Sequence, residues 1–331
     1  MATEVAYYTY IYAKVEPAKY PRVSSYTRMA ALTGRFISGT TAQLLTYFQL
    51  MDYRELNYIT FTAQILATFW AFWLPSVPYG IYFYRNKAAT ANVAVSSDNV
   101  NSITIEKKKK DVNAQEASFK SHLNDASRLI ARHARSAYTR PKVLGWSALY
   151  AVALALFVQL QTYMQLLWKL IQENTGTEVA YNGAVEAVQT LLGAGGAYLS
   201  SVYSPSIIVA PVAALQGVAL FFGTFTNHVF VSYAGYIVAG SLFHYTITLA
   251  SARIASQLSD ESCFGLIFGI NTLIGTALQS ILTAVMIQTL KLSIPAQYYT
   301  ISGFYLILAS IWLVAWMFTA FRQKRSVIAS N

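Results

Sequence analysis

The sequence contains few charged residues. Only 11% of its 331 residues are Asp, Glu, Lys or Arg, whereas soluble globular domains carry about 25%. Instead, 55% of the residues are hydrophobic, 15% are aromatic, and the mean hydropathy is +0.39. This composition excludes an ordinary soluble enzyme and a disordered chain. It predicts an all-α integral membrane protein.

Cysteine and catalytic motifs are also scarce. The single cysteine, Cys263, excludes a disulfide framework and a cysteine-based metal site. The chain has no HExxH, GxSxG or P-loop motif and no Cys/His cluster. We therefore expect the protein not to be an enzyme and to need no metal and no cofactor.

Long hydrophobic stretches recur along the chain. A transmembrane helix needs about 20 apolar residues to cross about 30 Å of hydrocarbon. Windows of that length predict eight spans, at residues 26–51, 56–84, 143–171, 179–202, 206–226, 229–258, 265–290 and 296–321. A shorter apolar stretch at residues 2–15 precedes them and is typical of the second half of a further helix.

The positive charge is concentrated on one side of the predicted membrane. If stretch 2–15 and the spans alternate in direction, 20 of the 24 Lys and Arg residues fall on that side, many of them in the polar segment 85–142. The positive-inside rule then predicts that this central segment and the C-terminus are cytoplasmic. The net charge of +10 therefore indicates orientation in a lipid bilayer, and we expect no nucleic-acid partner. Residues 111–135 are predicted to form a short helix.

The order of these segments fits a major facilitator architecture, with two helical bundles joined by a long cytoplasmic loop. The predicted parts are a remnant of the N-terminal bundle (1–84), a basic cytoplasmic linker (85–142), a six-helix C-terminal bundle (143–321) and a cytoplasmic tail (322–331). By comparison with two six-helix halves, we expect about three and a half helices of the N-terminal bundle to be missing.

Several short stretches are more specific than this architecture. They are ATEVAYYTYIY from Ala2, YPRVSSYTR from Tyr20, YNGAVEA from Tyr181, YAGY from Tyr233, ARIASQLS from Ala252 and LIFGINT from Leu266. In this order and at these separations, they resemble the family of reduced folate carriers and thiamine transporters. The resemblance covers nearly the whole chain except the central loop. It implies a twelve-helix facilitator of the plasma membrane that moves a small-molecule vitamin by alternating access.

The resemblance also bears on the charge of the substrate. Folates are anionic and thiamine is cationic, and a counter-charge inside a membrane is costly and so usually functional. Folate carriers have basic residues where this chain has Glu4, Gln279 and Gly240. Thiamine transporters resemble the chain at Glu4 and Gln279 but often keep a basic residue at position 240. We therefore expect thiamine as the substrate, with a pyridoxine-like vitamin or a reduced folate as alternatives.

Polar residues in the matching stretches are candidate substrate ligands. They are Glu4, Tyr7, Tyr163, Asn182, Glu186 and Gln279. The resemblance implies that Glu4 pairs with the cation, and Tyr7 shares its helix face and can stack on a ring. Alternatively, Glu4 is an exposed carboxylate without a ligand, and Tyr7 is one of the tyrosines that lie at the membrane interface. Asn182 either binds the substrate or caps a helix. Glu186 either binds the substrate or couples transport to protons, or else it forms half of a buried ion pair.

Tyr163 and two further polar residues, His244 and Arg35, lie inside predicted spans. His244 is a candidate for coupling transport to protons, although a lone helical histidine is more often only hydrogen-bonded. Tyr163 either lines the cavity or bonds between helices. Arg35 either pairs with a carboxylate on another helix or faces the cavity.

A different class of function is also compatible with the sequence. With helices missing from one bundle, the chain would be a membrane fragment that does not transport, or a regulatory partner of another protein. The sequence does not indicate an oligomeric state.

Overall fold

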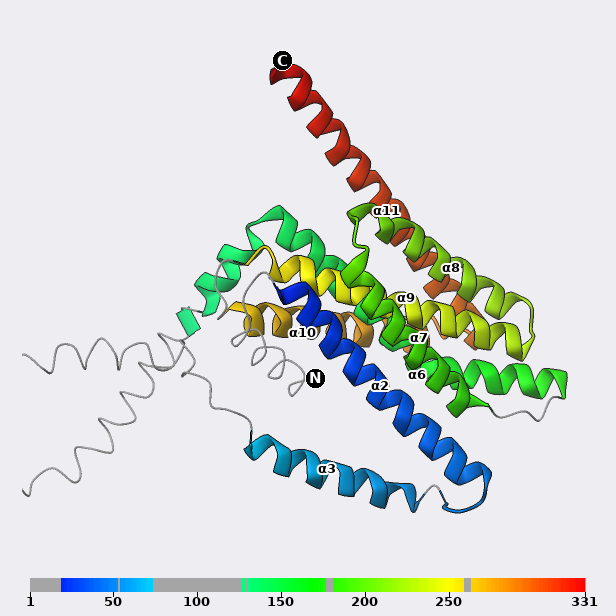
Figure 1. Cartoon of the computed structure of the whole chain (residues 1–331). Helices are drawn as coiled ribbons and strands as arrows, with labels where there is room; N and C mark the ends of the chain where they lie inside the picture. Colours follow the sequence, from blue (N-terminus) through cyan, green and yellow to red (C-terminus); the bar gives the residue numbers. More distant parts are fainter. Residues whose placement is uncertain are drawn as a thin grey trace, which may run out of the picture.

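The computed structural model shows a bundle of helices (Figure 1). It describes residues 19–52, 54–73, 127–128, 130–176, 181–258 and 263–330. The named elements in these residues are α2 (Tyr20–Tyr47), α3 (Leu56–Phe72), α6 (Pro141–Thr175), α7 (Asn182–Val202), η2 (Ser206–Ile208), α8 (Val209–Phe225), α9 (Val229–Ala255), α10 (Cys263–Thr283), the π-helical turn η3 (Ala284–Thr289) and α11 (Ile294–Ser330). The described residues contain no strand, as expected for an all-α protein.

Each predicted span contains a helix, but not every helix is apolar enough to cross a membrane. Within the described ranges, four helical segments have the necessary length and hydropathy: Pro141–Thr175, Ser206–Phe225, Phe264–Thr289 and Ile294–Phe321. Of the eight predicted spans, four are therefore confirmed by the length and hydropathy of their helices. Of the predicted helix at 111–135, most residues lie outside the described part of the chain, while residues 130–138 are helical.

The central helix α9 carries several buried hydroxyl groups. It packs against α6, α7 and α8, and less extensively against α2. Its hydroxyl side chains Thr246, Thr248 and Ser251 are buried, and each donates a hydrogen bond to the carbonyl four residues earlier. Because these groups face other helices and are satisfied within α9, the helix needs less apolar surface than one facing lipid.

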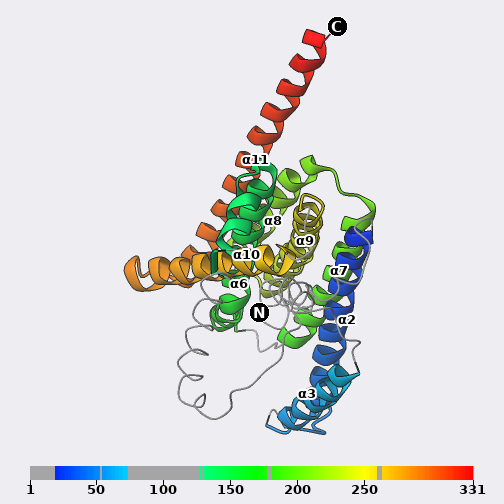
Figure 2. The ribbon, with the colours of Figure 1, turned by 90° about the vertical axis from the view of Figure 1, so that its left-hand side faces the viewer.

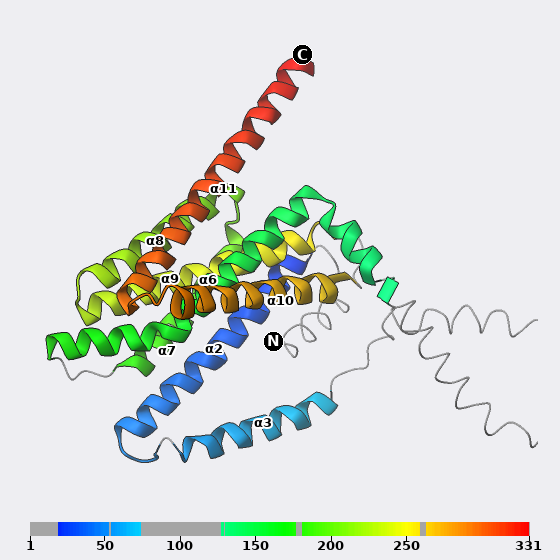
Figure 3. The same cartoon turned by 180° about the vertical axis from the view of Figure 1, so that it is seen from behind.

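The two N-terminal helices are attached to the bundle very differently. α2 packs along α7, where the buried Ser25 hydroxyl donates a 2.7 Å hydrogen bond to the Ala197 carbonyl. α3 contains no buried residue and lies apart from α6–α11 in both Figure 1 and Figure 2. At the other end of the chain, α11 packs on α8 and then extends beyond the bundle (Figure 3).

Glycines allow α7 and α9 to approach closely. A Cβ atom on Gly196 would lie 2.7 Å from the Ser241 carbonyl oxygen. A Cβ atom on Gly240 would lie 2.3 Å from Nε2 of Gln189, whose side chain is fully buried. The glycine at position 240, unusual for the family that the sequence resembles, is therefore explained by the Gln189 side chain, which fills the space beside it.

Two adjacent glycines provide a test of this packing. We expect Gly196→Ala to lower the free energy of unfolding by about 1–3 kcal/mol, because the added methyl group meets backbone that cannot move independently. Gly195→Ala is the matched control, since nothing lies within 4 Å of its added Cβ. The free energy of unfolding of the Gly195→Ala variant should equal or slightly exceed that of the unaltered protein, because alanine favours a helix more than glycine does. Unfolding in detergent measures both variants, and equal stability would contradict the close α7–α9 contact.

Candidate functional site

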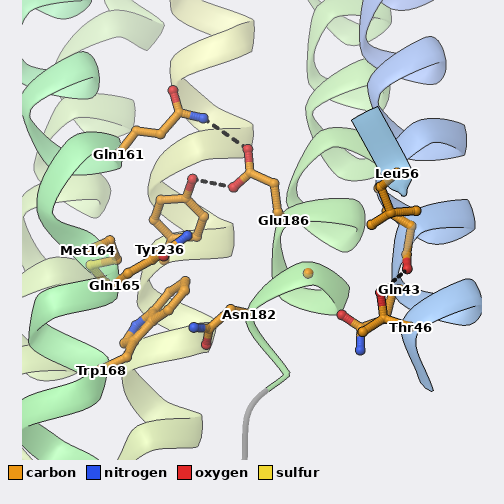
Figure 4. Close-up of a pocket in the computed structure, with 13 residues that line it drawn as sticks. Gln43, Thr46, Leu56, Gln161, Met164, Gln165, Trp168, Asn182, Glu186 and Tyr236 are labelled. Carbon is orange, nitrogen blue, oxygen red and sulfur yellow. Dashed lines mark hydrogen bonds between the residues drawn. The ribbon is translucent and has the colours of Figure 1, made fainter. Parts of the chain in front are cut away.

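A cavity of about 740 Å³ lies between α2, α3, α6, α7 and α9 (Figure 4). Its lining residues are Gly39, Ala42, Gln43, Thr46, Leu56, Gln161, Met164, Gln165, Trp168, Asn182, Gly183, Glu186 and Tyr236. A concave site of this size with a few convergent polar groups is typical of small-molecule binding. The cavity also lies between helices distant in sequence, which is a common position for ligand sites in helical proteins.

One face of α6 forms an aromatic and amide wall of the cavity. Gln161, Met164, Gln165 and Trp168 recur at helical spacing, so their side chains share that face. The Trp168 ring meets the rings of Tyr233 and Tyr236 edge-on, with centroids 4.7 and 5.4 Å apart. Trp168 is only 2% exposed, so the surrounding rings hold this wall in place.

Glu186 on α7 is the only charged residue among the described residues that line the cavity. Its Oε1 accepts a 2.9 Å hydrogen bond from Nε2 of Gln161, and its Oε2 accepts a 2.6 Å bond from the Tyr236 hydroxyl (Figure 4). Both donors are neutral, and no basic side chain in the described residues forms an ion pair with Glu186. The ion-pair alternative is therefore not found there. A carboxylate oxygen can accept further bonds, so Glu186 can also bind a ligand.

Asn182, at the start of α7, also lines the cavity. Its Oδ1 accepts a 3.1 Å hydrogen bond from the Tyr233 hydroxyl, which itself accepts a 3.3 Å bond from Nε2 of Gln172. The N-cap position belongs to Tyr181, which makes no capping hydrogen bond through its side chain. Asn182 is therefore tied to α9 at the cavity wall, rather than acting as a helix cap.

Other predicted ligands lie away from this cavity or outside the described residues. Gln279 on α10 donates hydrogen bonds to Oε1 of Gln159 (3.0 Å) and to the Thr283 hydroxyl (3.1 Å), at the contact between α6 and α10. Glu4 and Tyr7 lie outside the described residues. Their roles, and that of Gln279, remain predictions.

The remaining candidates are placed in the helical packing. Tyr163 packs against the hydrophobic core. The ring of His244 lies against those of Phe157 and Phe243, with centroids 5.6 and 5.1 Å apart. Arg35 is exposed on α2. None of these three lines the cavity, and proton coupling through His244 remains a prediction.

Sequence reasoning missed several residues of the cavity. Gln43, Gln161, Trp168 and Tyr236 all line it, and none was a candidate. The spacing of Gln161 and Trp168, seven residues apart on α6, is a sequence signal that could have identified that face. Tyr236 ends the YAGY stretch, which was a second signal, whereas Gln43 carried none, because its role depends on how α2 packs.

Comparison with known proteins identifies the family of the chain. The family model described as reduced folate carrier matches residues 1–300. Folate-like transporter 3 of Caenorhabditis elegans is 32% identical, over 98% of this chain and 74% of that protein. Folate transporter 1 of the same organism is 34% identical, over 98% of this chain and 70% of that protein. Thiamine transporter 2 of Macaca fascicularis is 29% identical, over 98% of this chain and 70% of that protein.

The family match spans most of the chain, and the relatives are membrane transporters aligned over nearly all of it. The resemblance of the short stretches is thereby confirmed. The chain belongs to the reduced folate carrier family.

Proposed function

We propose that this protein transports a cationic vitamin of the thiamine type across a membrane. The observation that carries the proposal is the presence of Glu186 as the single charged residue lining the described cavity. Tyr236 lies beside Glu186, and the Trp168 ring lies against that of Tyr236 (Figure 4). A carboxylate next to aromatic rings suits a ring-bearing organic cation, through charge and cation–π attraction. A folate would need a basic counter-charge, and none of the described residues that line this cavity is basic.

A reduced folate is the second candidate substrate. Folate-like transporter 3 and folate transporter 1 of Caenorhabditis elegans are 32% and 34% identical to the chain, thiamine transporter 2 of Macaca fascicularis is 29% identical, and the reduced folate transporter of Homo sapiens is 26% identical. Sequence identity at this level does not decide between substrates of opposite charge, because a few residues in the cavity determine that preference.

Alternating access is the proposed mechanism. The cavity lies between α2 and α3 on one side and α6, α7 and α9 on the other, so movement between these groups would change which end is open. The contact of α2 with α7 would have to separate. It includes the Ser25–Ala197 hydrogen bond near one end and the packing of Gln43 against Gly183 near the other.

The proposed orientation follows the positive-inside rule. Arg140 and Arg253 bind the carbonyls of Gln257 and Ser204, at the end of the bundle where α6 begins and α9 finishes. We place this end in the cytoplasm, and the protein in the plasma membrane.

Uptake measurements in cells expressing the chain test the proposed substrate. We expect saturable uptake of radiolabelled thiamine above that of cells without the chain, and inhibition by excess unlabelled thiamine. Radiolabelled folate is the matched comparison. Saturable folate uptake without thiamine uptake, or no uptake of either compound, would contradict the proposal.

The charge of Glu186 is the first residue-level prediction. Glu186→Gln keeps the size of the side chain but removes the charge, and we expect it to lower the ratio of Vmax to KM for thiamine about tenfold or more. Glu173→Gln is the control, because Glu173 is exposed and its one ion pair among the described residues is with Lys169, at 3.8 Å. Equal loss in both variants, at equal surface expression, would exclude Glu186 from the site.

The two donors that hold Glu186 provide a second prediction. Gln161→Leu and Tyr236→Phe each remove one hydrogen bond to the carboxylate. We expect each to raise KM for thiamine about threefold to thirtyfold, because the carboxylate is then less well oriented. Tyr299→Phe on α11 is the control, since Tyr299 does not line the cavity. Unchanged KM in both variants would show that these bonds do not contribute.

Glu4 is proposed as a ligand from the family resemblance alone. We expect Glu4→Gln to reduce thiamine uptake, because it removes a charge that would pair with the cation. Glu16→Gln makes the same change at another position of the N-terminal segment and is expected to have little effect. Thiamine uptake at equal expression measures both, and an unaffected Glu4→Gln variant would remove this residue from the proposed site.

A further inference from the structure

A short helix that precedes α6 has a basic face. Residues 127–128 and 130–138 are helical, and Arg128, Arg132 and Arg135 are all exposed. Their spacing of four and then three residues places them on one side of the helix. Between Ser127 and Lys142 the sequence contains no Asp or Glu. We call these three arginines the basic face.

The other side of this helix is attached to the bundle. Ala137 is buried in the main hydrophobic core, and the Tyr138 hydroxyl donates a 2.7 Å hydrogen bond to Oδ1 of Asn271 on α10. Burial raises the pKa of Tyr138 to about 12, so the hydroxyl keeps the proton that it donates at physiological pH. Arg140 donates a 2.6 Å bond to the Gln257 carbonyl. These contacts orient the helix, and the basic face is therefore turned outward.

The charges of the described residues differ strongly between the two ends of the bundle. The end at which α6 begins carries the basic residues Lys19, Arg22, Arg128, Arg132, Arg135, Arg140, Lys142 and Arg253 and no described acidic residue. The opposite end carries the acidic residues Asp52, Glu55 and Glu173 and the basic residues Arg54, Lys169 and Lys291. Asp125, Asp260 and Glu261 lie outside the described residues.

The position of the helix relative to α6 indicates what the basic face meets. α6 begins at Pro141 and is long and apolar enough to cross a membrane. Arg135 is six residues earlier, and the chain bends between the two helices (Figure 3). A path of six residues is about 9 Å at helical rise, comparable to the Debye length of about 8 Å at physiological salt. Arg135 therefore lies within electrostatic reach of the membrane surface, and Arg132 and Arg128 lie on the same side of the helix, farther from α6.

We propose that Arg128, Arg132 and Arg135 bind the headgroups of anionic phospholipids in the adjacent leaflet. Basic residues beside a membrane-crossing helix attract acidic lipids, and the planar guanidinium group can bind phosphate through two parallel hydrogen bonds. A membrane is favoured over an acidic protein because the helix leads directly into α6. This site is separate from the substrate cavity and does not depend on which vitamin is transported.

Native mass spectrometry of the purified full chain in neutral detergent tests the proposal. The probe is phosphatidylserine, and phosphatidylcholine with the same acyl chains is the comparison. We expect the chain to retain phosphatidylserine preferentially, and Arg128→Gln/Arg132→Gln/Arg135→Gln to reduce its occupancy about tenfold. The variant with lysine at the same three positions keeps the charge and should retain most of the binding.

A matched control removes three positive charges from the opposite end, as Arg54→Gln/Lys169→Gln/Lys291→Gln, and should retain phosphatidylserine like the unaltered chain. Equal loss in both triple variants, equal retention of the two lipids, or full competition by inorganic phosphate would overturn the proposal. So would tighter binding of a poly-glutamate peptide than of phosphatidylserine, since this would indicate an acidic protein partner. Circular dichroism of each variant confirms that the helices remain formed.

Discussion

Polar groups inside a membrane have little water to bind, so they depend on partners within the protein. This constraint determines much of the arrangement of helices. Thr246, Thr248 and Ser251 of α9 donate hydrogen bonds to carbonyl groups of their own helix, and Gln279 and Thr283 of α10 both bind Gln159 of α6. These hydrogen bonds allow polar side chains to lie between packed helices.

Glu186 shows how the same constraint shapes the candidate site. Its two oxygens accept hydrogen bonds from Gln161 on α6 and Tyr236 on α9, so one carboxylate connects three helices. The charge is held in place before any ligand arrives. A cation entering the cavity would then meet a fixed carboxylate, and little of its binding energy would be spent on ordering the site.

The sequence predicted the positions of the helices well, because each depends on a local run of apolar residues. It also identified Asn182 and Glu186, which line the cavity. It could not identify the partners of Gln279, since Gln159 is 120 residues away and such a pairing depends on helix packing.

The contact between Gly240 and Gln189 makes these two positions interdependent. Any larger residue at 240 would collide with the Gln189 amide, whose nitrogen and oxygen have no hydrogen-bond partner in the described part of the chain. Replacing Gln189 with a shorter residue would therefore break no hydrogen bond found in the described part of the chain, and it would free the space beside Gly240. The effects of substitutions at 189 and 240 are therefore not independent, because the two side chains compete for the same volume. A basic residue at 240 would be tolerated only after residue 189 had been replaced by a smaller one.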